Sequence, residues 1–268
     1  MAMTPKERWH AILRGETPDR LPTDYWTTPE FHEKLKRALG CNEDEAVYER
    51  LGIDRPYVVA PRLKLAHHPD DPAADLWGVR MQRVDHGSGA YDEVVCSPLA
   101  SAETPADIDR FRWPEPDDFD YTTVERAVAE DPGRRVIQGG WFEPFLMYAR
   151  MRGMEQAYED LLLWPEVAER MFERLFDICF EYNRRNFEAG GGRIELFLMA
   201  EDLGSQNGPL FSVETYRRFF RDSQRRMADL ARSYGAHVMY HTDGAARAFL
   251  PDLVEEVGIE VLNPIQWR

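Results

Sequence analysis

From residue 134 onward, short apolar segments alternate with amphipathic helices, and this alternation limits the fold more than any other feature. Apolar segments of strand length occur at 136–138, 194–199, 236–240 and 259–262. The intervening helices carry apolar residues every three to four positions, as helices that cover a sheet do. Strands that alternate with helices predict a parallel sheet, and 268 residues have room for a (β/α)₈ TIM barrel, which needs about 250 residues.

The N-terminal half adds elements that a simple barrel lacks. We expect helices at 5–14, 29–39 and 43–51, strands at 21–26 and 57–60, and a β-hairpin within 76–99 that turns at Gly87-Ser88-Gly89. Candidate barrel strands then number about six, against eight in a closed barrel. We therefore expect one domain, 1–268, that is truncated at its C-terminus. Low activity and poor solubility should follow, with rescue by about 60 to 80 further residues.

Charge and composition exclude several classes of partner. The chain has 33 Lys and Arg against 48 Asp and Glu, a net charge of −15 that disfavours nucleic acid and anionic membrane surfaces. Its start lacks a signal-peptide pattern, and no apolar run is long enough to span a membrane. The three cysteines form no CxxC pair. We expect a cytoplasmic protein with reduced thiols.

Polar residues follow three of the predicted strands, where parallel α/β proteins place their chemistry. Strand alternation should let at most one of the carboxylates of Glu201 and Asp202 face the barrel axis. His241 and Asp243 are two apart on an extended segment and can share a face, as a metal pair or as a base with its orienting carboxylate. The candidate residues after these strands are Glu201, Asp202, Gln206, Asn207, His241, Asp243 and Asn263.

Structural explanations exist for the same residues and stay open at this point. Glu201 and Asp202 can cap helices or face water, and the glycines near them can serve only to make turns. A His-x-Asp pair is common by chance, and the segment at Asn263 can be a simple turn.

Several ordered motifs along nearly the whole chain resemble the uroporphyrinogen decarboxylase superfamily. This superfamily includes the decarboxylase and methylcobalamin-dependent methyltransferases that deliver methyl groups to thiols. The motifs are Thr4-Pro5-Lys6-Glu7-Arg8, Gly15-Glu16-Thr17-Pro18-Asp19-Arg20-Leu21-Pro22, Leu76-Trp77-Gly78-Val79, Gly140-Trp141-Phe142-Glu143-Pro144, Arg152-Gly153-Met154-Glu155, 201–209, His241-Thr242-Asp243-Gly244, Pro251-Asp252-Leu253-Val254-Glu255 and 262–266.

The resemblance is closer to the methyltransferase branch than to the decarboxylase. Decarboxylases of the family bind substrate carboxylates through an Arg-rich strand end, whereas this chain continues Thr27-Thr28-Pro29. The methyltransferases hold zinc with a His, a Cys two residues later and a second Cys near the C-terminus. Here His241 matches the first ligand and Asp243 takes the place of the first Cys, while the second would lie beyond Arg268. An oxygen ligand makes such a site less selective for zinc.

The resemblance therefore implies methyl transfer in a corrinoid-linked pathway, assisted by zinc or another divalent metal. We assign His241, Asp202 and Glu201 as catalytic candidates, with His241 and Asp243 as metal ligands. Asp243 is also a substrate-binding candidate, together with Gln206, Asn207 and Asn263. The implied partners are a small-molecule substrate, a corrinoid protein as methyl donor, and a second copy in a homodimer. There are two alternatives. One is a cofactor-free tetrapyrrole decarboxylase, which would be a lyase of porphyrin metabolism. The other is a non-catalytic ligand-binding barrel.

Overall fold

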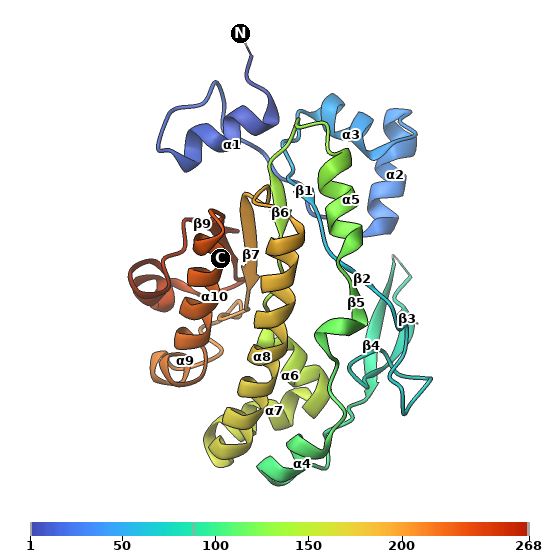
Figure 1. Cartoon of the computed structure of the whole chain (residues 1–268), viewed down its shortest axis with the longest axis vertical. Helices are drawn as coiled ribbons and strands as arrows, with labels where there is room; N and C mark the ends of the chain where they lie inside the picture. Colours follow the sequence, from blue (N-terminus) through green and yellow to red (C-terminus); the bar gives the residue numbers. More distant parts are fainter. Residues whose placement is uncertain (1, 88, 267–268) are drawn as a thin grey trace.

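A five-stranded parallel sheet forms the centre of the computed structural model, which describes residues 2–87 and 89–266. Neighbouring strands follow the order β1-β6-β7-β8-β9, so the last four lie side by side in chain order (Figure 1). Sequential parallel strands joined by helices are the arrangement of a (β/α)₈ barrel, and the predicted α/β class is confirmed. The strands are β1 (Tyr57–Val58), β6 (Ile137–Gly139), β7 (Leu196–Ala200), β8 (His237–His241) and β9 (Val261–Asn263).

The helices either cover this sheet or build the N-terminal elaboration. The 25-residue helix α8 runs alongside β6 and β7 in Figure 1, and its predicted apolar stripe is buried. The helix predicted between the apolar segments at 194–199 and 236–240 is divided at Phe220 into α9 and α10. The helices are α1 (Pro5–Leu13), α2 (Pro29–Leu39), α3 (Asp44–Leu51), α4 (Pro105–Arg110), α5 (Thr122–Glu130), α6 (Pro144–Arg152), α7 (Met154–Leu163), α8 (Pro165–Ala189), α9 (Val213–Phe219) and α10 (Arg221–Ser233), with short helical turns at Pro116–Asp118, Arg247–Phe249 and Asp252–Val257.

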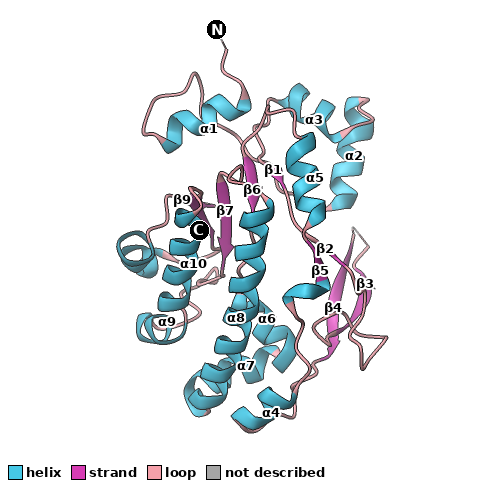
Figure 2. Cartoon of the chain, in the orientation of Figure 1, coloured by secondary structure: helices cyan, strands magenta, loops and turns pink. Residues whose placement is uncertain are grey.

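The predicted hairpin is confirmed as β3 (Arg80–Asp85) and β4 (Ala90–Cys96), which pair antiparallel apart from the central sheet (Figure 2). A second small antiparallel pair joins β2 (Arg62–Leu63) to β5 (Phe119–Asp120). Within 2–87 and 89–266, no helix is long and apolar enough to cross a membrane.

The strand predicted at 21–26 is wrong. Its backbone is bound instead to the segment that follows α3: Asp54 N donates to Thr23 O at 2.7 Å, and Thr23 N donates to Asp54 Oδ2 at 3.0 Å. Arg55 Nη1 donates to Tyr25 O at 2.9 Å. Because these partners take the groups that a ladder would need, residues 21–28 stay irregular and the central sheet has five described strands, not six.

Candidate functional site

The candidate residues gather where β7, β8 and β9 end. Ala200 pairs with His241, and His241 pairs with Asn263, so the ends of the three strands are aligned in one row. Past this row, Glu201 N donates to His241 O at 3.0 Å and Thr242 N donates to Asn263 O at 3.0 Å. The sheet register therefore brings the predicted residues of all three loops to one edge, which is the functional edge of parallel α/β folds.

Two glycines allow the loops after β7 and β8 to touch. A Cβ on Gly204 would lie 2.3 Å from Ala245 N, and a Cβ on Gly244 would lie 2.4 Å from the carbonyl carbon of Gly204. Gly244 also has a φ of +74°, which other residues rarely adopt. Ala245 N donates to Ser205 O at 3.0 Å across this contact. The glycines thus do more than make turns, because they hold the two loops together.

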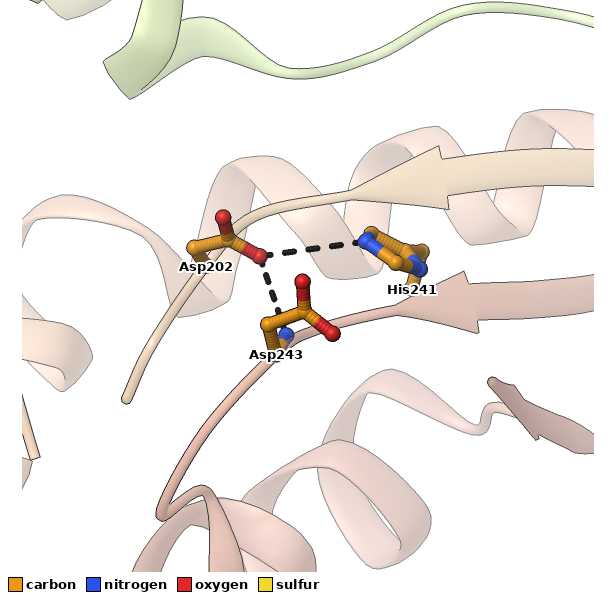
Figure 3. Close-up of side chains that lie close together, drawn as sticks. All are labelled: Asp202, His241 and Asp243. Carbon is orange, nitrogen blue, oxygen red and sulfur yellow. Dashed lines mark hydrogen bonds and ion pairs between the residues drawn. The ribbon is translucent and has the colours of Figure 1, made fainter. Parts of the chain in front are cut away.

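Asp202, His241 and Asp243 form the centre of the site (Figure 3). One ligand atom from each lies within 4.8 Å of the other two. Asp202 Oδ1 lies 3.9 Å from His241 Nε2 and accepts a hydrogen bond of 2.9 Å from Asp243 N. Both carboxylates are exposed and the imidazole is partly buried. In Figure 3 the side chains converge on one small volume from the end of β8 and from the loops that follow β7 and β8.

The hydrogen bond that His241 donates to Asn263 determines which ring nitrogen of His241 is free. Asn263 Oδ1 lies 2.9 Å from His241 Nδ1. Because an amide oxygen can only accept, Nδ1 carries the proton and donates it. The lone pair is then on Nε2, the nitrogen that faces Asp202. Metal-binding histidines are oriented in this way by a partner on their other nitrogen.

The donor set of one imidazole and two carboxylates fits a divalent metal. Zinc binds His nitrogen and carboxylate oxygen at about 2.0–2.2 Å. The distances between the three ligand atoms would therefore have to shorten by about an ångström around a zinc ion. Larger cations that prefer oxygen fit the present spacing more easily. Asp202 therefore becomes a third candidate metal ligand beside His241 and Asp243. From the sequence we had assigned Asp202 to catalysis and not to metal binding.

Glu201 lies apart from this cluster. Its side chain is buried and accepts a hydrogen bond of 2.8 Å from Phe145 N, in the first turn of α6. Burial, more than the nearby charges of Glu143 and Asp202, raises the pKa of Glu201 well above its ordinary value. As strand alternation predicts, the two adjacent carboxylates have different surroundings, and Asp202 is the one beside His241.

Sequence reasoning missed two polar residues of this region, Glu143 and Tyr158. Burial first, and then the charge of Asp202, raises the pKa of Glu143. Burial also raises the pKa of Tyr158, and the charges of Glu201 and Asp202 add to the effect. Glu143 follows the end of β6, so the rule that we applied to the three later strands would have found it.

The amide candidates lie at the rim. Gln206 is exposed, and its Oε1 accepts a hydrogen bond of 2.8 Å from Gln266 Nε2. Gln266 Oε1 in turn accepts from Gly244 N at 2.5 Å, which connects the loops after β7, β8 and β9. Asn207 is exposed, and its backbone N donates to Ser205 Oγ at 3.2 Å. The substrate-binding roles of Gln206 and Asn207 stay predictions.

A family model described as Uroporphyrinogen decarboxylase (URO-D) matches residues 91–266, which include every candidate above. The chain belongs to this family. No curated protein sequence matches the chain. Among solved structures, a methyltransferase from Methanosarcina mazei has a TM-score of 0.61 and 19% identity, over 97% of this chain and 75% of the other. At that identity the likeness shows a shared fold. The predicted membership of the family is thus confirmed.

Replacing Asn263 with alanine is expected to weaken metal binding about 10- to 100-fold, the usual cost of losing an outer partner of a ligating histidine. The Nδ1 proton would lose its acceptor, and the imidazole could rotate or change tautomer. Isothermal titration of the metal-free protein with zinc or manganese measures the effect. Equal affinities of wild type and Asn263→Ala would contradict this role for Asn263.

Glu201→Gln is expected to stabilise the protein more at pH 8 than at pH 5. Because the folded-state pKa of Glu201 is raised, the folded state binds this proton more tightly than the unfolded state. The free energy of unfolding therefore falls as pH rises from the ordinary carboxyl range through the raised pKa. Glutamine keeps an acceptor for Phe145 N and removes the titration. Urea unfolding at both pH values, with chelator present, measures the difference, and an equal effect at the two would refute it.

Proposed function

We propose that this chain is a metal-dependent methyltransferase that takes its methyl group from a corrinoid-bearing partner protein and gives it to a small-molecule acceptor. The observation that carries the proposal is the convergence of His241 Nε2 with the carboxylates of Asp202 and Asp243 at the carboxyl ends of β7 and β8. Membership of the family and the fold shared with a methyltransferase support it.

His241, Asp202 and Asp243 would hold the metal, which acts as a Lewis acid that lowers the pKa of the bound acceptor. Asn263 keeps the Nδ1 proton of His241 in place and so keeps Nε2 available. Glu143 is a partly buried carboxyl with a raised pKa, suited to accept the proton that an acceptor loses on activation. Two oxygen ligands with one nitrogen make the site harder than a zinc thiolate centre, so we expect manganese or iron to compete with zinc.

Decarboxylation of a tetrapyrrole is the alternative that the family name supports, with His241 or Asp202 as proton donor. The surroundings count against it. The exposed carboxylates of Asp202 and Asp243 both lie in the site, and negative groups there repel a substrate that itself carries several carboxylates. A third possibility is a barrel that only binds a ligand.

Turnover of two substrates separates these functions. The protein, stripped of metal with chelator and refilled with zinc, manganese or iron, is mixed with methylcobalamin and a thiol, and demethylation is followed by absorbance. In parallel, CO₂ release from uroporphyrinogen is measured. We expect metal-dependent demethylation and no CO₂ release. Metal-independent CO₂ release would establish the decarboxylase instead, and no turnover of either substrate would favour the binding protein.

A further inference from the structure

We infer that Trp26 is a positioning residue of the site: its indole lies against the imidazole of His241 and fixes the plane of that ring. This inference rests on the proposed function, because the imidazole is positioned for a metal. Neither the motifs nor the strand-end rule pointed to Trp26, whose segment we predicted to be a strand of the sheet.

The contact itself is a stacked pair. The centroids of the two rings are 5.1 Å apart and their planes differ by 24°. Trp26 Nε1 donates a hydrogen bond of 2.6 Å to Asp24 Oδ2, which orients the indole. Trp26 is nevertheless 47% exposed. An indole left half in water contributes little to a core, so contact with His241 is the clearest consequence of its placement.

The segment that carries Trp26 is fixed at both ends. On one side, Thr23 exchanges two hydrogen bonds with Asp54, a fully buried carboxylate that also binds Arg8 and Arg20. On the other side, Thr28 caps α2 by accepting a hydrogen bond from Phe31 N. A loop held at both ends can hold a side chain in one place at a smaller entropic cost than a free loop.

Trp26 and Asn263 together restrict the ring of His241. Asn263 binds the Nδ1 edge, and the indole covers one face. Rotation about the bond from Cβ to the ring would break the hydrogen bond and the stacking at once. The lone pair of Nε2 is then aimed at Asp202 before any metal arrives, which lowers the cost of ordering the site on binding.

Nuclear magnetic resonance tests the contact directly. A stacked indole shifts the ring protons of His241 upfield, and these signals are assigned in histidine-labelled protein by comparison with His241→Gln. We expect the upfield shift to be lost in Trp26→Leu and partly kept in Trp26→Phe, which retains an aromatic ring. Trp164→Leu is the matched control, since Trp164 is a similarly exposed tryptophan at the start of α8, and it should leave the shift unchanged. Unchanged His241 signals in Trp26→Leu would overturn the inference.

Metal affinity tests the consequence. We expect Trp26→Leu to bind zinc or manganese about 10-fold more weakly than wild type, which is the smaller cost of losing a group that orients a metal ligand. Trp26→Phe and Trp164→Leu should bind the metal as tightly as wild type does. If wild type binds metal and Trp26→Leu binds it equally well, the inference fails and the proposed function stands. If wild type binds no metal, the proposed function fails, and with it the positioning role.

Discussion

His241→Ala is expected to lower the affinity for a divalent metal by more than about 100-fold, beyond the cost of losing an outer-shell partner. The substitution removes the one nitrogen ligand of the group and leaves two exposed carboxylates. Methyl transfer should fall in parallel. The fold should persist, because His241 ends a strand and its partly exposed ring lies outside the buried core. Elemental analysis and isothermal titration measure the metal, and thermal unfolding measures the fold.

His237→Ala is the control for this experiment. His237 is the first residue of the same strand, so it lies at the opposite end of β8 and pairs with Glu260. It should leave metal binding and turnover unchanged. A His241→Ala protein that binds metal as tightly as wild type would remove His241 from the site. If both variants lost metal and unfolded at lower temperature, the loss would be structural instead.

Asp160→Ala is expected to lower the free energy of unfolding by about 3–5 kcal/mol, the cost of breaking a buried ion pair. Asp160 is fully buried and accepts from Arg152 Nε at 2.7 Å and from Tyr148 OH at 2.7 Å. Arg152, itself 4% exposed, would be left with an uncompensated charge. Arg152 Nη1 also donates to Leu99 O at 2.7 Å and to Ala100 O at 3.2 Å, and these bonds tie α6 to the segment after the hairpin. The motif that begins at Arg152 thus has a structural role.

Glu169→Ala is the matched control, because Glu169 and Arg218 form an ion pair of 2.7 Å in which both side chains are half exposed. Its loss should cost less than about 1 kcal/mol. Chemical denaturation measures both variants. Equal and small effects would mean that the Arg152–Asp160 pair contributes little, and the structural explanation of the motif would be wrong.

The sequence predicted the parts of the fold that depend on local pattern. The apolar stripe of α8, the hairpin and the helix that begins at Pro5 all follow from spacing and from residues within a few positions. The prediction of a strand at 21–26 was wrong because the backbone of this segment forms hydrogen bonds with Asp54, about thirty residues away in the sequence. Local apolar composition cannot reveal such a competitor.

The site was predictable to the same extent. Strand ends and i, i+2 spacing predicted that His241, Asp243, Asp202 and Asn263 lie close together, because a parallel sheet brings successive strand ends to one edge. The structure places them together, and their roles stay predictions. The division of roles was not predictable. Glu201 and Asp202 are adjacent in sequence, but only the structure shows their different contacts. Glu201 accepts a hydrogen bond from the first turn of α6, and Asp202 lies beside His241. Trp26 could not be found from spacing at all, since its loop folds back from the other end of the chain.

The most direct test of the central claim is the position of a bound metal. Crystals grown with zinc or manganese and measured at the absorption edge of that metal give an anomalous difference map. We predict a single strong peak bonded to His241 Nε2 and to one carboxylate oxygen each from Asp202 and Asp243, with zinc distances of about 2.0–2.2 Å. A map without a peak at these residues, or with the metal held elsewhere in the chain, would contradict the account.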